Sequence, residues 1–108
     1  MPKFLYSGNY TAEGAAGLLS ESGTARHEEA KKIANSMGGT LEAYYWCYGE
    51  KDFLMILDIP SESMAIKFSL AIGAWGGFQG KLTPIITVEQ MDEAISTELP
   101  EMRLPGDK

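Results

Sequence analysis

The chain has 108 residues, of which 44% are hydrophobic and 22% are charged, a composition typical of one globular domain and too apolar for a disordered chain. Nine Lys and Arg stand against fifteen Asp and Glu, which leaves a net charge of −6. Because no basic cluster interrupts this acidic balance, a phosphate backbone would be repelled, and the composition argues against a nucleic-acid partner.

The sequence also gives no reason to expect a membrane partner. Residues 1–6 contain no long apolar stretch of the kind that a secretory leader has. The most apolar segment, residues 68–75, is far shorter than the ~20 residues that span a bilayer. The single Cys47 has no partner for an internal disulfide, which agrees with a reducing compartment. We therefore expect a cytoplasmic protein.

In chain order, the first elements are a strand and two helical runs. Residues 3–10 predict a strand because Phe, Leu and Tyr have good β propensity. The first helical run is expected to be capped by Thr11 and the second by Thr24. Gly38-Gly39 then supplies the C-terminal stop of the second run.

The clearest strand pattern covers residues 40–48 and begins a hairpin. Strict alternation places Leu41, Ala43, Tyr45 and Cys47 on the face that packs under the helices, and Glu42, Tyr44, Trp46 and Tyr48 on the other. A short polar connection leads to a return strand at residues 53–59. That strand is apolar on both faces over most of its length, and it therefore needs cover on both sides.

The second half of the chain predicts a helix, a strand and a last short helix. Ser61 is the expected cap of the first of these helices. The strand covers residues 78–88, and Pro84 within it indicates an edge position or a bulge. Thr87 and Gln90 form a capping box for the last helix.

This order of elements predicts an α+β fold. It reads β-α-β-β-α-β with a C-terminal helix, the ferredoxin-like plan, in which the helices cover one face of a four-stranded antiparallel sheet and leave the other face bare. We expect one such domain over residues 1–97 and an extended C-terminal tail over residues 98–108.

The predicted bare face implies a second copy of the chain. By strict alternation it carries Tyr44, Trp46 and Tyr48, whose side chains have roughly 450–750 Å² of surface. The largest exposed apolar patch of a typical monomer is only about 300–600 Å². We therefore expect a homodimer that pairs sheet to sheet about a two-fold axis. The alternative is an ordinary solvated face with some exposed aromatic side chains.

Several runs of residues together resemble a known family over nearly the whole chain, up to about Ala94. The runs are Tyr10-Thr11-Ala12-Glu13-Gly14, Gly38-Gly39-Thr40-Leu41-Glu42-Ala43-Tyr44-Tyr45, Asp58-Ile59-Pro60 and Leu82-Thr83-Pro84-Ile85-Ile86-Thr87. They resemble the GYD domain family. The resemblance implies a ferredoxin-like fold of the dimeric α/β-barrel group. It implies no reaction, because the members of that family are largely without an assigned function.

The hairpin departs from the family pattern at one position. The family name refers to a Gly-Tyr-Asp signature, and here the hairpin reads Gly49-Glu50-Lys51-Asp52, with Lys51 where the tyrosine would stand. A role that needs a phenol at this turn is therefore not expected. From the residues that remain, we expect Gly49 to take a positive φ and Asp52 to accept hydrogen bonds from N–H groups of the turn.

No single residue predicts a catalytic centre. His27 lies in a charged helical segment, where a solvated histidine is expected rather than a general base. Cys47 is expected to be a small core residue rather than a nucleophile. The chain has no metal-ligand spacing and no glycine pattern that cradles phosphate, so we expect neither a metal nor a cofactor.

The candidate site is the bare face itself, where polar side chains join the three aromatic ones. The seven residues are Ser7, Asn9, Tyr44, Trp46, Tyr48, Lys81 and Thr83. If two paired sheets do not close completely, these residues line a partly apolar pocket for a small molecule. If the sheets do close, the residues only pack the interface.

Three functions stay open on the sequence. The first is a homodimeric domain that binds a small apolar or aromatic molecule in this pocket. The second is a cofactor-free enzyme of the monooxygenase or isomerase type, with Lys81, Tyr44 or Glu42 as the acid or base, which rests on analogy between folds. The third is a structural or regulatory partner of another protein.

Overall fold

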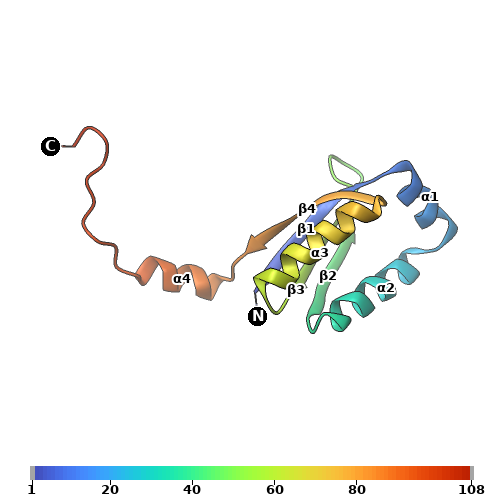
Figure 1. Cartoon of the computed structure of the whole chain (residues 1–108), viewed down its shortest axis with the longest axis horizontal. Helices are drawn as coiled ribbons and strands as arrows, with labels where there is room; N and C mark the ends of the chain where they lie inside the picture. Colours follow the sequence, from blue (N-terminus) through green and yellow to red (C-terminus); the bar gives the residue numbers. More distant parts are fainter. Residues whose placement is uncertain (1, 108) are drawn as a thin grey trace.

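The structure is a computed structural model that describes residues 2–107, and within them the fold is α+β, one four-stranded antiparallel sheet with four helices. The elements are β1 (Lys3–Tyr10), α1 (Ala12–Ser20), α2 (Gly23–Ser36), β2 (Thr40–Trp46), β3 (Phe53–Asp58), α3 (Glu62–Trp75), β4 (Phe78–Ile85) and α4 (Val88–Ser96). The strand order in the sheet is β2-β3-β1-β4. Helices α2 and α3 lie over one face of the sheet (Figure 1). The predicted fold class is confirmed at this level.

Four side-chain caps begin the helices, and three of them are the predicted ones. The hydroxyl oxygens of Thr11, Ser61 and Thr87 each accept a hydrogen bond from the backbone N–H three residues later. In α2 the cap is Ser22 rather than the predicted Thr24, because the helix begins earlier than expected. Each such cap satisfies one of the N–H groups that a helix leaves without a partner at its start.

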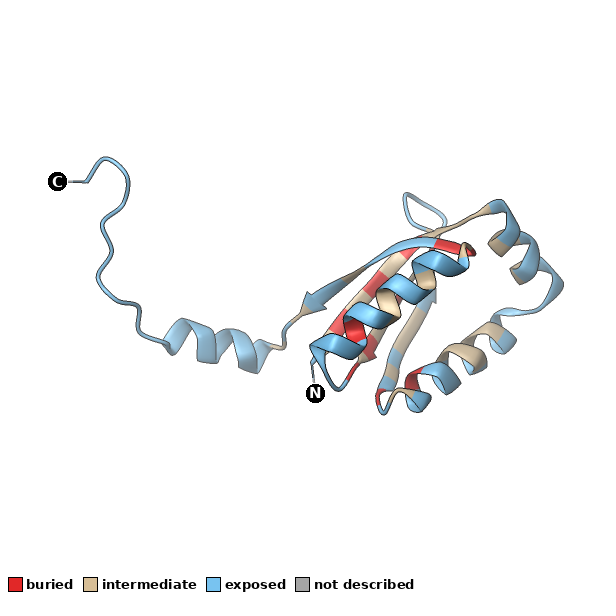
Figure 2. Cartoon of the chain, in the orientation of Figure 1, coloured by how far each residue is buried: buried red, intermediate tan, exposed pale blue. Residues whose placement is uncertain are grey.

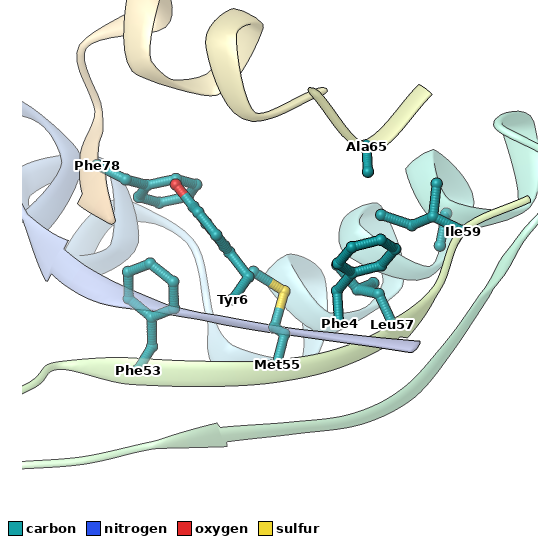
Figure 3. Close-up of a cluster of buried hydrophobic side chains, with 9 residues drawn as sticks. Phe4, Tyr6, Phe53, Met55, Leu57, Ile59, Ala65 and Phe78 are labelled. Carbon is teal, nitrogen blue, oxygen red and sulfur yellow. The ribbon is translucent and has the colours of Figure 1, made fainter. Parts of the chain in front are cut away.

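The hydrophobic core lies between the sheet and helices α2 and α3 (Figures 2 and 3). Its buried members are Phe4, Tyr6, Ala34, Phe53, Met55, Leu57, Ile59, Ala65 and Phe78. Every second residue is buried in β3, and in β1 as far as Gly8, which is the pattern of strands covered on one face only. Three rings form the centre of the core, with the centroid of Tyr6 5.7 Å from that of Phe53 and 6.4 Å from that of Phe78.

Strand β2 contains a bulge that interrupts the alternation of its side chains. Leu41 pairs with Leu57 of β3, and Ala43 pairs with Ile56, so Glu42 is one extra residue between two consecutive pairs. Such a bulge shifts every later side chain of the strand to the opposite face.

The bulge reverses the predicted faces of β2 beyond Glu42. Tyr44 pairs with Met55 and Trp46 pairs with Phe53, and both partners are buried under the helices. Tyr44 and Trp46 therefore lie on the helix-covered face, and their predicted place on the bare face is wrong. Tyr45, which was predicted to pack under the helices, lies on the bare face instead and is 63% exposed.

Strand β4 is an edge strand, as Pro84 predicts, and the chain beyond it leaves the body of the molecule (Figure 1). All of residues 88–107 are exposed. The radius of gyration is therefore 17.8 Å, compared with about 13 Å for a compact chain of this length. The domain boundary expected at residue 97 stays a prediction, and α4 lies out with the tail rather than on the sheet.

Candidate functional site

A cleft of about 210 Å³ opens between α2, α3 and the covered face of the sheet, and we call it the helix-side cleft. Most of its wall is apolar, with Ile33 and Phe68 on the two helices and Met55 on the floor. Ala30 and Ala34 stand one helical turn apart on the side of α2 that lines the cleft. Their short side chains leave open the volume that larger residues would fill.

Two charged residues of α2 also line this cleft. Arg26 is largely covered, since its side chain is only 19% exposed, and its Nη1 lies 4.0 Å from Oε2 of Glu21. Glu29 pairs with Lys32, with Oε2 3.8 Å from the Lys32 Nζ. The guanidinium of Arg26 therefore brings a positive charge to an otherwise apolar wall, and its long contact with Glu21 leaves donor groups free for another acceptor.

Tyr44 adds a phenol to the cleft and is held in place by its neighbours. Its ring stacks on that of Trp46, with centroids 4.2 Å apart and planes 22° from parallel. Trp46 in turn donates a hydrogen bond from Nε1 to the hydroxyl oxygen of Tyr10 at 2.8 Å. The ring of His27 lies 6.2 Å from that of Tyr44. Residues from β1, α2 and β2 thus fix the orientation of Tyr44.

Burial raises the pKa of both phenols of the cleft, so they stay protonated well above neutral pH. Burial raises the pKa of Tyr6 to about 12. Burial, and then the interaction with the Tyr10 hydroxyl, raise the pKa of Tyr44 above its ordinary value, while the nearby charge of Arg26 opposes this rise. Both phenols are therefore available as hydrogen-bond donors rather than as bases.

A second, smaller cleft of about 120 Å³ adjoins the first and shares Arg26, Trp75 and Phe78 with it. Its other lining residues come mainly from α1 and include Glu13 and Leu18. Arg26 consequently stands where the two hollows meet.

The structure separates the seven residues that the sequence grouped into one site. Ser7 pairs with Lys81 across β1 and β4, and Thr83 pairs with Leu5, so these polar residues lie with Asn9 on the bare face. Tyr44 and Trp46 lie on the other side of the sheet. Tyr48 lies beyond the end of β2 and is fully exposed, at 104%.

The bare face retains an apolar centre without those aromatic residues. Its members are Leu5, Ala43, Tyr45, Leu54 and Ile56, and we call them the bare-face patch. Lys3 stands at its margin, with Nζ 3.0 Å from Oδ1 of Asp58 and 3.2 Å from Oε1 of Glu42. The hydrogen bond with Asp58 is the main cause that raises the pKa of the Lys3 amine.

The sequence matches the GYD domain family over residues 4–95. The chain belongs to this family. The matched span runs from β1 into α4, so the whole helix-side cleft and the bare-face patch lie within the GYD domain. Searches of curated proteins and of solved structures found no match.

In the hairpin of this GYD domain, the backbone of Gly49 and the hydrogen bonding of Asp52 both differ from the predictions. Within residues 2–107, glycines with a positive φ are confined to Gly38, Gly76 and Gly106, so the expected positive φ of Gly49 is wrong. Asp52 does accept a backbone hydrogen bond, but from Tyr10 N at 2.9 Å rather than from its own turn. Asp52 thus fixes the end of β1, from which the Tyr10 side chain reaches Trp46.

The remaining candidate residues show no catalytic arrangement. His27 is 45% exposed, with Nδ1 3.8 Å from Oε1 of the adjacent Glu28. Cys47 is half-buried and does not belong to the buried core, so its predicted place in the core is wrong. Among the residues that the structure describes, no three or more His, Cys, Asp or Glu side chains gather where they could hold a metal ion. No helix within residues 2–107 has the length and apolar character to cross a membrane.

Of the residues that line the helix-side cleft, the sequence had placed only Tyr44 in a candidate site, and it missed those of α2 and α3. Arg26 and Ala30 lie in a segment that reads as an ordinary charged helix. The one available signal was the pair of small residues Ala30 and Ala34 at a spacing of four, which places two short side chains on one side of a helix.

Proposed function

We propose that this GYD domain binds a small molecule, of about the size of one substituted aromatic ring, in the helix-side cleft. The cleft volume of about 210 Å³ is the observation that supports this size. An apolar cavity of ~150 Å³ in another protein holds benzene, and drug-sized ligands occupy sites of about 300–1,000 Å³. The apolar wall with a few converging polar groups is the usual make-up of a small-molecule site.

The polar groups of the cleft favour a ligand with an acidic group. Arg26 supplies the positive charge, and its planar guanidinium suits a carboxylate. Tyr44 supplies a neutral phenol that can donate a further hydrogen bond. The negative charge of Glu29 is partly offset by Lys32, so it opposes an anion only weakly.

The test is a titration of the 15N-labelled protein with benzoate and with its neutral counterpart benzamide, followed by NMR. We expect benzoate to shift amide signals of α2, β2 and α3, and to bind more tightly than benzamide. Arg26→Gln should remove this preference, because an Arg–carboxylate contact contributes roughly 1.5–3 kcal/mol. If neither compound, nor any member of a set of single-ring acids and amides, shifts these signals, the proposal fails.

Two matched substitutions locate the site. Ala30→Leu fills the helix-side cleft and should abolish the shifts, whereas Ala43→Leu adds the same atoms on the bare face and should leave them unchanged. Both residues are half-buried in the wild-type protein. The opposite result would move the site to the sheet face that carries Lys81 and Thr83.

The bare-face patch supports a homodimer, of the ferredoxin-like and dimeric α/β-barrel type. Leu5, Leu54 and Ile56 lie on neighbouring central strands, with Leu5 directly opposite Ile56. Full burial of an aliphatic side chain of this size is favourable by about 1.5–3 kcal/mol. A second sheet would cover them, and a two-fold axis makes the contact self-complementary.

A charged substitution in this patch tests the pairing. Leu54→Glu should convert the dimer to monomers in sedimentation equilibrium, because it would bury a charge without a partner. Leu19→Glu is the matched control, since Leu19 on α1 is 87% exposed and lies outside the patch. The pairing is rejected if the Leu54→Glu protein sediments as a dimer or if the wild-type protein is a monomer.

A cofactor-free oxygenase or isomerase is a second candidate, and the phenol of Tyr44 favours it. Lys81 and Glu42 lie outside the cleft, so Tyr44 is the one group of the three that could donate a proton to a bound ring compound. Product formation from a compound that binds, measured by liquid chromatography, should then fall with Tyr44→Phe. A compound that binds and is recovered unchanged argues for binding alone.

A further inference from the structure

The C-terminal arm, residues 86–107, is exposed over almost its whole length (Figure 2). It carries large apolar side chains that the rest of its own chain leaves uncovered. They are Ile86, Val88, Met91, Ile95, Leu99, Met102 and Leu104, each between 48% and 75% exposed. On α4, the spacing of Val88, Met91 and Ile95 places all three on one side of the helix. A helix with such a stripe is stable where another surface covers it.

The solvent-accessible surface of the chain is larger than that of a compact monomer of the same mass. The chain exposes 7,819 Å², whereas a compact monomer of its 11.8 kDa mass exposes about 5,900 Å². The excess of about 1,900 Å² is of the size that one chain contributes to a large, permanent protein interface.

The same chain offers an apolar hollow of matching length, which we call the α3–β4 groove. It has a volume of about 590 Å³ and lies between α3 and the strands β1 and β4. Its apolar lining residues are Pro2, Phe4, Ala65, Ile66, Leu70, Leu82 and Pro84. Ile66 is 54% exposed and Leu70 is 67% exposed, so both are open to a partner.

The two lengths can be compared through the rise of an α-helix. At about 1.5 Å per residue, the groove extends about 12 Å along α3 from Glu62 to Leu70. The stripe of α4 extends about 10.5 Å from Val88 to Ile95.

We propose that the C-terminal arm of one copy lies in the α3–β4 groove of a second copy. The arm of the second copy lies in the groove of the first in the same way. The arm runs on beyond the end of β4, away from its own α3 (Figure 1). Only Ile86 and Thr87 connect β4 to α4, and the capping box of Thr87 with Gln90 fixes the start of the helix. Exchange about a two-fold axis covers two arms and two grooves at once.

This proposal rests on the pairing of two copies proposed above, although it uses a different surface. The bare-face patch lies on the opposite side of the sheet from α3. The two surfaces can therefore be tested separately.

A disulfide between two different chains tests the exchange directly. All chains carry Cys47→Ser, which removes the native thiol. One full-length chain then carries Met91→Cys, and the other carries Ile66→Cys with a different tag, and the two are co-expressed and oxidised. Both substituted side chains are exposed in the single chain, so the substitutions should not prevent folding.

We expect a disulfide between the two tags, visible as a double-mass band on a non-reducing gel and lost on reduction. Glu93→Cys on the opposite side of α4 is the matched control and should give at most one tenth of that band. A disulfide that forms only within one chain carrying both Met91→Cys and Ile66→Cys would show that the arm folds back on its own groove, and would overturn the exchange.

The oligomeric state separates the failure of this proposal from the failure of the bare-face pairing. A dimer in sedimentation equilibrium without the disulfide between chains would overturn the arm exchange and leave the bare-face pairing in place. A monomer would overturn both.

Discussion

Alkaline pH should destabilise this GYD domain, and Tyr6 should cause a defined part of the loss. The Tyr6 side chain is 2% exposed, and burial raises its pKa from the ordinary 10 to about 12. A pKa that is higher in the folded state than in the unfolded state means that folding favours the protonated phenol. The resulting stabilisation is complete below pH 10 and is lost as the pH rises from 10 through about 12.

The size of this loss follows from the two pKa values. At pH 11 the unfolded Tyr6 is mostly ionised and the folded one is mostly protonated, so unfolding becomes easier by about 1.4 kcal/mol from this residue alone. Tyr44, whose pKa burial also raises, adds to the loss in the same direction.

The assay is urea unfolding followed by far-UV circular dichroism at pH 8 and at pH 11, for the wild-type protein and for Tyr6→Phe. Between pH 8 and pH 11, the wild-type protein should lose about 1.4 kcal/mol more unfolding free energy than Tyr6→Phe does, because the variant has no phenol to ionise at this position. Charge repulsion at high pH acts on both proteins and cancels in the difference.

Tyr48→Phe is the matched control, since Tyr48 is fully exposed and its replacement should leave the pH dependence unchanged. If Tyr6→Phe loses as much stability between pH 8 and pH 11 as the wild-type protein, the Tyr6 phenol is not buried as the structure places it.

Three further substitutions test the hydrogen bond of Asp52 and the close contact of α1 with Gly77. Asp52→Ala removes the acceptor for Tyr10 N, and we expect the unfolding free energy to fall by about 1.5–3 kcal/mol in urea titrations; an unchanged midpoint would contradict this role. Gly14→Ala places a methyl group against the carbonyl oxygen of Gly77 and should cost about 1–3 kcal/mol in the same assay. Gly17→Ala on the same helix meets open space and should stabilise the protein by up to about 1 kcal/mol, so equal effects of the two would contradict the contact.

Local chemistry is what allowed much of the fold to be predicted from the sequence. The caps Thr11, Ser61 and Thr87 act through backbone groups three residues away, so their signals lie within one helical turn. β1 was predicted with its observed bounds because its residues have consistent β propensity. The family resemblance to the GYD domain was confirmed over residues 4–95.

The faces of β2 could not be predicted because they depend on a contact that is distant in the sequence. The extra residue Glu42 is defined only by the pairing of Leu41 and Ala43 with consecutive residues of β3. Nothing in residues 40–48 themselves distinguishes a bulge from strict alternation.

The helix-side cleft could not be predicted for a related reason. Its volume depends on the distance between α2 and α3, which is set by how both helices pack on the sheet. Arg26 and Ala30 acquire a shared role only through that packing. The direction of α4 is likewise a matter of tertiary structure, although the helix itself and its capping box were predicted.

The bulge also changes the energetic case for a homodimer. With Tyr44 and Trp46 on the covered side, Tyr45 is the one aromatic side chain of the bare-face patch. The other large side chains of the patch are the aliphatic Leu5, Leu54 and Ile56. At about 1.5–3 kcal/mol each, these residues from two copies contribute at most about 9–18 kcal/mol. No more than about a third of each residue is still exposed in the single chain, which reduces the gain to about a third of that or less.

Association of two chains costs an estimated 4–15 kcal/mol in lost translational and rotational freedom. The bare-face patch alone therefore does little more than offset this cost. The C-terminal arms carry seven further apolar side chains per copy, and covering them would supply the surplus that a stable dimer needs. The bulge removes Tyr44 and Trp46 from the bare face and adds only Tyr45, so the exchange of arms becomes more important to the proposed dimer.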